Sequence, residues 1–251
     1  MDITQTFYDS LASHYDKLFL DWQATTKEQA VILDQIFRNN GFDSTARILD
    51  CACGIGTQSI GLAALGYPVT ASDISDAELA QARERAAKNQ VDIPFVHADF
   101  CALSEIFSES FDIIICMDNA LPHMLSPDAL ESAIKSITQK IADNGIFVAS
   151  IRDYDALLTQ KPPYSPPYIH QTPNGQRVSF QTWHWNEDRY KLVQYIIDDE
   201  ESLQVSKFVC EYRATTRCEI SSLLLRHGCS EVSWLFPEKT GFYQPIVVAK
   251  K

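Results

Sequence analysis

The amino-acid sequence predicts an α/β fold: a doubly wound, mostly parallel sheet of seven strands that ends in an antiparallel hairpin and carries an inserted antiparallel sheet. Between residues 47 and 151, short apolar runs alternate with helical segments. Strands that are apolar throughout and separated by helices are typical of a parallel sheet with helices on both faces. Between residues 161 and 214, aromatic-rich runs alternate apolar with polar residues between short polar turns, which indicates antiparallel strands.

The first part of the chain, up to about residue 40, is predicted to be helical. Phe7, Leu11 and Tyr15 recur at four-residue spacing, which places them on one face of a helix. A similar pattern continues until Gly41, a residue type that commonly ends helices. We therefore expect residues 1–45 to form a helical cap next to the sheet.

The parallel part of the sheet is expected to follow, with strands and helices in alternation. The helix starts are well marked, because Ser75 and Glu78 have the spacing of a capping box and Ser126 precedes a proline at the first helical position. The expected strands are 47–51, 67–73, 93–99, 111–117 and 146–151, and the expected helices are 57–66, 75–90 and 126–145.

The chain then leaves this pattern and returns to it. A proline-rich loop at 161–168 precedes three expected antiparallel strands, and a helix capped by Thr216 and Glu219 leads into the final hairpin. We expect an inserted subdomain at 161–214 within a ligand-binding domain made of 46–160 and 215–251. The inserted strands are expected at 176–186, 190–198 and 203–214, the last helix at 217–228, and the hairpin strands at 230–236 and 242–251.

The charge balance argues against a nucleic-acid partner. With 33 Asp and Glu against 21 Lys and Arg, the formal net charge is −12, and no dense basic run is present to bind phosphates. No apolar stretch reaches the roughly 18 residues that a membrane span needs, and the first residues do not resemble a secretory signal. Seven cysteines, an odd number scattered through apolar segments, favour reduced thiols. We expect a cytoplasmic protein without membrane or nucleic-acid partners.

A glycine turn directly after the first strand predicts a ligand site. Gly54 and Gly56 lie between a strand and a helix, where backbone N–H groups and the positive helix end approach a ligand. The third glycine of the dinucleotide fingerprint is missing, because Ser59 stands there. No Lys or Arg lies between Asp50 and Asp73 to offset a pyrophosphate. An acid that ends the second strand can accept ribose hydroxyls, so a cofactor with a ribose and a cationic amino-acid group, but no phosphate, suits this loop best.

These motifs resemble those of the class I S-adenosylmethionine-dependent methyltransferases, whose sheet is Rossmann-like. Matching segments are 50–56 as the glycine loop, with Thr57 in place of a third glycine, Asp73 as the ribose acid, 97–100 and 111–119. The resemblance implies S-adenosyl-L-methionine as cofactor, with Asp99 bonded to the adenine amine and Phe100 beside the ring. The cofactor-binding residues that it implies are Tyr15, Asp50, Ala52, Gly54, Gly56, Asp73, Ile74, Asp99, Phe100, Met117 and His123.

The acceptor is expected beyond the carboxyl ends of the fourth and fifth strands. An arginine that directly follows an apolar strand, Arg152, suits bidentate binding of a carboxylate. Residues 118–123 and 152–155 are similar to those of the glycine and sarcosine N-methyltransferases. That resemblance implies that Arg152 binds the substrate carboxylate, Asn119 orients the amine, and Tyr212 and Tyr243 line the pocket.

This chain departs from the glycine and sarcosine N-methyltransferases at several positions. Asp118 replaces their glycine and Asp153 their asparagine, and each change adds negative charge beside the proposed carboxylate site. Their N-terminal arginine, which binds the cofactor carboxylate, has no clear match, and Lys27 is only a weak substitute. Glycine, sarcosine or a similar small carboxylate-bearing amine is thus the expected acceptor, and the departures place glycine itself in doubt.

Several alternatives stay open on the sequence alone. The acceptor could be an amino sugar or a hydroxyl-bearing metabolite, or the protein could be a nicotinamide-dependent oxidoreductase or bind its cofactor without turnover. Arg152 could instead form a surface ion pair with Asp153 or Asp155. Cys51 and Cys53 lack a second pair at zinc spacing, so we expect no metal. The aromatic residues 183–185 are expected on a packed or homodimer-forming face of the inserted sheet, with a smaller chance that they line the acceptor pocket.

Overall fold

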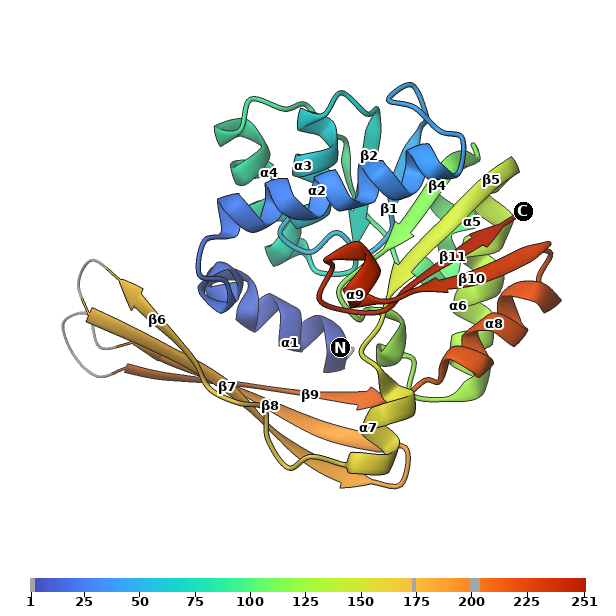
Figure 1. Ribbon diagram of the computed structural model, residues 1–251. Coiled ribbons are helices and arrows are strands. Elements are labelled where there is room, and N and C mark those ends of the chain that lie inside the picture. Colours follow the sequence, from blue (N-terminus) through green and yellow to red (C-terminus); the bar gives the residue numbers. More distant parts are fainter. Residues whose placement is uncertain (1–2, 173–174, 199–203) are drawn as a thin grey trace.

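The protein folds around two sheets that are separate in space, as the computed structural model in Figure 1 shows for residues 3–172, 175–198 and 204–251. The larger sheet has seven strands in the order β10-β11-β5-β4-β1-β2-β3, and the smaller has four in the order β6-β7-β8-β9. This arrangement confirms the predicted fold class. Within the described residues, no helix is long and apolar enough to cross a membrane.

The large sheet is parallel except at β11, which pairs antiparallel with both β5 and β10. Parallel pairing joins β4, β1, β2 and β3 in that order and also joins β4 to β5. The carboxyl ends of the parallel strands therefore lie along one edge, where ligands bind in open α/β sheets. The strands are β1 (Ile48–Asp50), β2 (Val69–Asp73), β3 (Phe95–His97), β4 (Phe111–Cys116), β5 (Ile141–Ser150), β10 (Glu231–Leu235) and β11 (Ile246–Lys250).

Helices cover both faces of this sheet, as a doubly wound fold requires. Strand β4 shows the two cores, because Ile114 packs in one hydrophobic cluster with residues of α6 and α8, and Ile113 packs in another with residues of α2, α3 and α4. The helices are α1 (Ile3–Leu11), η1 (Ala12–Leu18), α2 (Trp22–Asn39), α3 (Thr57–Ala64), α4 (Asp76–Lys88), η2 (Phe100–Ala102), α5 (Leu103–Ile106), η3 (Leu121–His123), α6 (Pro127–Lys140), α7 (Tyr154–Gln160), α8 (Arg217–Arg226) and α9 (Pro237–Thr240).

The auxiliary sheet, formed by strands β6 to β9, is antiparallel throughout and lies next to helix α1. Phe7 and Leu11 of α1 share a hydrophobic cluster with Leu192 and Tyr212 of this sheet. The N-terminal helix thus fills the space between the two sheets. The strands are β6 (Tyr168–Thr172), β7 (Gly175–Asn186), β8 (Arg189–Asp198) and β9 (Gln204–Arg213).

The structure corrects the expected boundary between α6 and β5 and adds elements that the pattern did not predict. The helix expected over 126–145 ends at Lys140, and β5 begins at Ile141. Ile141 pairs with Phe111, and a bulge follows in which Asn144 has a left-handed φ of 63°. A short bulge of this kind has no sequence period to reveal it. Among the described residues the unpredicted elements are β6, η2, α5, η3, α7 and α9.

Candidate functional site

Two glycines shape the loop after β1 because its backbone has left-handed conformations. Gly54 has φ 52° and Gly56 has φ 87°, which favour glycine. A Cβ atom at Gly56 would lie 3.0 Å from Ile60 Cδ1. The Gly54 N–H donates to Asp73 Oδ2 over 2.8 Å, which ties the loop to the end of β2. The loop therefore exposes its backbone at the carboxyl edge of the sheet.

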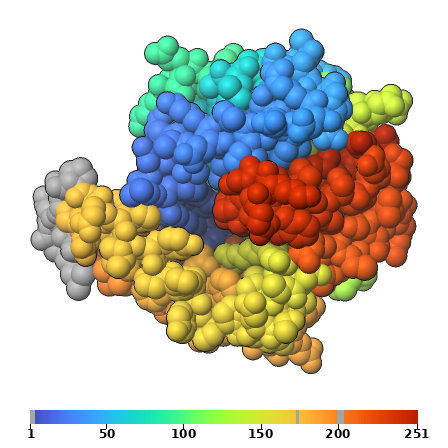
Figure 2. Space-filling view, in the orientation of Figure 1, coloured from blue at the N-terminus to red at the C-terminus, as the bar shows by residue number. Residues whose placement is uncertain are grey.

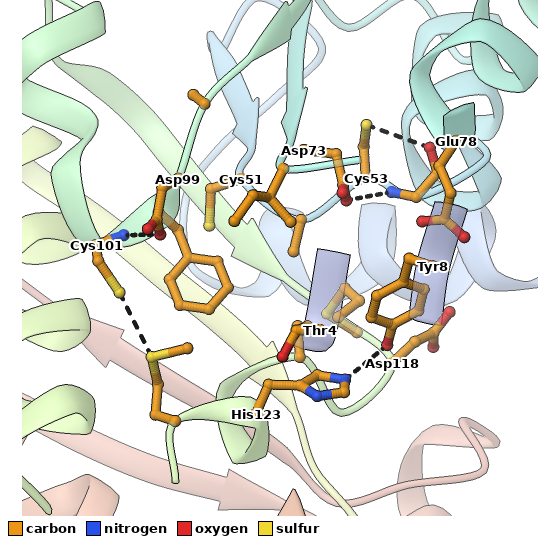
Figure 3. A pocket seen from close by; sticks show the side chains of 18 of the residues that line it. Thr4, Tyr8, Cys51, Cys53, Asp73, Glu78, Asp99, Cys101, Asp118 and His123 are labelled. Atoms are coloured by element: carbon orange, nitrogen blue, oxygen red, sulfur yellow. Dashed lines mark hydrogen bonds between the residues drawn. The ribbon is translucent and has the colours of Figure 1, made fainter. Parts of the chain in front are cut away.

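This loop borders an inner cavity of about 480 Å³ (Figure 3). Two of the residues expected to bind the cofactor, Asp50 and Gly56, do not line it. Asp50 is fully buried and accepts a hydrogen bond from Ser59 Oγ over 2.6 Å, so it supports the loop from below. Burial raises the pKa of Asp50 to about 7. The expected residues that do line the inner cavity are Tyr15, Ala52, Gly54, Asp73, Ile74, Asp99, Phe100, Met117 and His123.

The inner cavity has an acidic wall, which suits a cationic ligand. Glu78 is buried, and its Oε1 has no hydrogen-bond partner in the described part of the chain. Burial and the neighbouring carboxylates Asp73 and Asp9 raise the pKa of Glu78 well above its usual value. Burial likewise raises the pKa of Asp73, against the lowering effect of hydrogen bonds from backbone N–H groups. The charged residues that line the inner cavity are Asp73, Glu78, Asp99, Asp118, Arg189 and Glu211.

This acidic wall fits a cofactor that carries a sulfonium and a ribose better than one with a pyrophosphate. The unpartnered Glu78 carboxylate can accept a hydrogen bond or face a positive charge. A Cβ atom at Gly54 would lie 3.1 Å from Glu78 Oε2, so a side chain there would intrude on this carboxylate. The acids of the inner cavity outnumber its one cationic lining residue among the described residues.

Sequence reasoning missed Glu78 and Tyr8 as site residues. In a capping box the glutamate would bond back to the N–H of Ser75, but that N–H donates to Asp73 Oδ1 over 3.0 Å. Only the reciprocal half of the box is present, with Ser75 Oγ accepting from the Glu78 N–H, and the Glu78 side chain points into the cavity (Figure 3). Tyr8 enters from α1, and a 2.8 Å hydrogen bond joins its Oη to His123 Nε2. Neither orientation has a signal in the sequence.

A larger outer groove of about 890 Å³ adjoins the inner cavity, and Tyr8, Tyr15 and Asp118 line both. Figure 2 shows a hollow between the C-terminal segment around α9, in red, and the strands of the auxiliary sheet, in yellow. The four residues expected at the acceptor site, Asn119, Arg152, Tyr212 and Tyr243, all line this groove. The expected cofactor and acceptor residues are thus brought together as two adjoining sets.

Arg152 lies against the aromatic floor of the outer groove. Its guanidinium lies 5.0 Å from the ring centre of Trp183 and 5.4 Å from that of Tyr212. Its Nη1 donates to Tyr190 Oη over 2.7 Å, and its Nη2 donates to Gln181 Oε1 over 3.0 Å. In the described part of the chain no carboxylate pairs with it. A guanidinium has five N–H donors, so further donors remain for a ligand.

The ion-pair alternative for Arg152 is wrong, because Arg217 pairs with both nearby acids instead. Arg217 Nη1 lies 2.5 Å from Asp153 Oδ1 and 3.4 Å from Asp155 Oδ2. The expected negative charge of Asp153 beside the carboxylate site is therefore offset within the protein. Lys27 is exposed and lines neither cavity. Trp183, expected mainly on a packed or dimer-forming face, lines the groove.

Asp118 and Asn119 form the boundary between the inner cavity and the outer groove. Both have left-handed backbones, with φ values of 56° and 71°. Asp118 accepts hydrogen bonds from Gln58 Nε2 over 2.8 Å and from the Tyr243 hydroxyl over 2.7 Å. Burial raises the pKa of Asp118, although these two hydrogen bonds lower it. Asn119 Oδ1 accepts from the Arg152 N–H over 3.0 Å, which fixes the amide at the start of the groove.

The sequence has recognisable relatives. Residues 48–145 match the family described as a methyltransferase domain. Over 154 residues the chain is 25% identical to the glycine/sarcosine N-methyltransferase of Aphanothece halophytica. This alignment covers 61% of this chain and 57% of that protein. The chain thus spans little more than half the length of this curated relative.

Solved structures match over nearly the whole chain. An S-adenosylmethionine-dependent methyltransferase from Clostridium acetobutylicum ATCC 824 has a TM-score of 0.76 at 18% identity, covering 97% of this chain and 98% of that one. An amino pentose methyltransferase from Micromonospora echinaspora, whose structure has S-adenosylmethionine bound, has a TM-score of 0.72 at 17% identity. This match covers 90% of this chain and 91% of that one. At these identities the likeness shows a shared fold.

Proposed function

We propose that this chain, whose residues 48–145 match a methyltransferase domain, uses S-adenosylmethionine to methylate the amine of a small molecule that also bears a carboxylate. The domain match and the fold support the methyltransferase part of this proposal. The amine is suggested by distant relatives that are glycine/sarcosine N-methyltransferases. The carboxylate is suggested by Arg152, and that observation carries the choice of substrate.

The inner cavity would hold S-adenosylmethionine. Asp73 ends β2 where a carboxylate can accept ribose hydroxyls, Phe100 can flank the adenine, and Asp99 can bond its amine. The acidic wall with Glu78 favours the positive charge of the cofactor over a neutral molecule of the same shape. When bound, the cofactor would supply a methyl group on a positively charged sulfur. An uncharged amine can attack this methyl carbon in line with the sulfur, which is the leaving group.

Arg152 would bind the acceptor's carboxylate. A guanidinium that is partly desolvated, stacked on Trp183 and left without an acidic partner is suited to a ligand that brings its own negative charge. The acceptors Tyr190 Oη and Gln181 Oε1, to which the arginine donates, also fix the plane of its guanidinium. The amine of the same acceptor would lie near Asn119, at the opening toward the inner cavity.

Asp118 would take the proton that the acceptor's ammonium must lose before it reacts. The residue borders both cavities, so its carboxylate lies where the amine and the methyl group would meet. Each of its oxygens accepts one hydrogen bond in the described structure and can accept another. The negative charge that places glycine in doubt on sequence grounds thus acquires a role in the proposed reaction.

Methyl transfer from labelled S-adenosylmethionine to matched pairs of amines tests the proposal. Each pair consists of an amino acid and the amine that remains after loss of its carboxylate, such as glycine with methylamine and phenylalanine with phenethylamine. We expect the carboxylate-bearing member to have the higher kcat/KM in the pairs that react, because only it can bind Arg152. Equal rates within the pairs, or cofactor binding without transfer to any amine, would contradict the proposal.

An amino sugar is the second candidate acceptor. It is favoured by the amino pentose methyltransferase of similar fold, but it has no carboxylate for Arg152. Including amino sugars in the same panel decides between the two, since Arg152→Ala would affect only the methylation of carboxylate-bearing acceptors. The expected homodimer through the auxiliary sheet and the cytoplasmic location stay predictions.

A further inference from the structure

We propose that the acceptor is an amino carboxylate with an uncharged aromatic or alicyclic body, and that this body lies along the ring-lined outer half of the groove. The inference rests on the proposed function, because it takes the acceptor's carboxylate to be held by Arg152. It separates this chain from an enzyme for glycine alone and gives the auxiliary sheet a part in substrate choice.

The outer groove is far larger than glycine requires. Its volume is about 890 Å³, within the roughly 300–1,000 Å³ of sites that hold drug-sized ligands. Glycine has five non-hydrogen atoms. If each takes the ~30 Å³ that a water molecule occupies in the liquid, glycine would fill only ~150 Å³ of the groove. An acceptor of glycine's size would therefore leave most of the groove filled with water.

Aromatic side chains surround the mouth of the groove and remain exposed. Tyr164 and Tyr168 are 61% and 62% exposed on the side of the proline-rich segment, and Tyr243 is 59% exposed on the side of the C-terminal segment. Phe236 is also an exposed hydrophobic residue of the lining. Rings that converge on one groove from separate parts of the chain form an apolar surface typical of a ligand site.

The proline-rich segment is held in place, so this aromatic surface is formed before a ligand binds. The backbone N–H of Trp183 donates to Pro163 O over 2.8 Å, and the backbone N–H of Ser165 donates to Gln181 O over 2.9 Å. Trp185 Nε1 donates to Pro162 O over 2.9 Å. These bonds attach the segment that carries Tyr164 to the edge of the auxiliary sheet. A preformed wall lowers the entropic cost of binding a rigid ring.

Two amides near the floor, those of Gln181 and Gln194, are already hydrogen-bonded within the protein and so favour an apolar body next to Arg152 over a sugar. Gln181 Nε2 donates to Gln194 Oε1 over 2.9 Å, while Gln181 Oε1 accepts from Arg152 and from Trp183 Nε1. Gln194 Nε2 in turn donates to the carbonyls of Phe180 and Tyr195. Both amides are engaged within the protein, so they would have to break these bonds to bind sugar hydroxyls. Among its described lining residues the groove thus offers one cation, Arg152, next to rings, and three acids, Asp118, Asp153 and Glu238.

Binding of two unreactive carboxylates tests the inference without any methyl transfer. Calorimetry would compare 3-phenylpropanoate with propanoate, which share the carboxylate but differ in the ring. We expect 3-phenylpropanoate to bind at least about tenfold more tightly, because burying a phenyl ring in an apolar site contributes that much or more. The Tyr164→Ala variant should lose a clear part of this advantage. Leu225→Ala, which removes an exposed apolar side chain from α8 outside the groove, is the matched control and should keep it.

The outcomes separate the inference from the function on which it rests. Equal binding of the two carboxylates, together with methylation of glycine, would overturn the ring-binding groove and leave the proposed function standing. Equal binding of 3-phenylpropanoate by wild type and Arg152→Ala would overturn the carboxylate site and with it the proposed function. A kcat/KM for ring-bearing amino carboxylates at least about tenfold above that for glycine would support the inference in turnover.

Discussion

The inner cavity and the outer groove meet at Asp118 but differ in charge and in origin. The inner cavity is bordered by acids such as Asp73 and Glu78, which suit a cation. Among the described residues the groove also has acids in its lining, Asp118, Asp153 and Glu238, but it places its one arginine, Arg152, against aromatic rings, which suits a carboxylate on an apolar body. Asp118, together with Tyr8 and Tyr15, lines both spaces, so these shared residues lie between a site for a cation and a site arranged around one arginine.

The origin of the two sites explains this difference. The inner cavity is built mainly from loops at the carboxyl ends of β1 to β4, a position that the fold itself provides for ligands. The groove is built by segments added to that fold: α7, the proline-rich segment, the auxiliary sheet and α9. The comparison teaches that the cofactor site follows from the edge of the parallel sheet, whereas the expected acceptor site depends on segments outside that sheet.

Replacing Arg152 should have the largest effect and be confined to the groove. Loss of two charge-assisted hydrogen bonds, each worth about 1.5–3 kcal/mol, predicts that Arg152→Ala lowers kcat/KM for a carboxylate-bearing amine by roughly 100-fold or more. The dissociation constant of S-adenosylmethionine should change by less than about threefold. Arg226→Ala is the matched control, because that arginine pairs with Glu131 and lines neither cavity. An equal loss of cofactor affinity in Arg152→Ala would break the division between the sites.

Replacing Asp118 tests the boundary itself. If its carboxylate takes the acceptor's proton, Asp118→Asn should lower kcat/KM by roughly 100-fold at pH 7, the lower end of the about 10²–10⁴-fold that general bases contribute. The loss should shrink toward pH 9.5, where the amine loses its proton to water. Tyr243→Phe removes a hydrogen bond that lowers the pKa of Asp118 and should move the acid limb of the pH profile upward. A pH-independent loss in Asp118→Asn would contradict the proton transfer.

Replacing Glu78 should affect only the inner cavity. Its pKa is raised, and a cation binds better to the ionised carboxylate, so affinity for S-adenosylmethionine should increase as pH rises through that pKa. Glu78→Gln should weaken binding about tenfold at high pH and flatten this dependence, as calorimetry would measure. Glu78 also interacts electrostatically with Asp73, Asp9 and Tyr8. Because the pKa of Asp73 is raised too, cofactor affinity in Glu78→Gln should still depend weakly on pH. S-adenosylhomocysteine, which lacks the sulfonium charge, should show a smaller change, and an equal change would contradict the charge argument.

The inner cavity could be largely predicted from sequence because many of its residues lie at or soon after the carboxyl ends of apolar strands. Gly54, Asp73 and Asp99 lie next to β1, β2 and β3, and parallel strands bring such positions to one edge. The orientation of Glu78 could not be predicted, because the backbone bond that turns it inward depends on Asp73 from another element.

The groove could be predicted only in part. Arg152 and Asn119 follow β5 and β4, so the same edge rule located them. The contact of Tyr164 with Thr182 joins the proline-rich segment to β7, and nothing local in either stretch specifies that pairing. The bonds from Gln181 to Arg152 and Gln194 likewise depend on the tertiary arrangement of the auxiliary sheet.

Replacing Asp153 should have the smallest effect. It tests whether the ion pair with Arg217 already neutralises the charge of Asp153 beside the groove. The glycine and sarcosine N-methyltransferases resembled here have asparagine at this position, so Asp153→Asn removes the extra charge. Because Arg217 already offsets it, we expect KM for the carboxylate-bearing acceptor to change by less than about threefold. The double variant Asp153→Asn with Arg217→Ala should show the same small change in KM as Asp153→Asn. Arg217→Ala alone leaves the charge of Asp153 without its partner, so it should raise KM more than the single Asp153→Asn variant or the double variant does. A tenfold fall in KM for Asp153→Asn would show that the acid still repels the acceptor, and that Arg152 does not act in isolation from its neighbours.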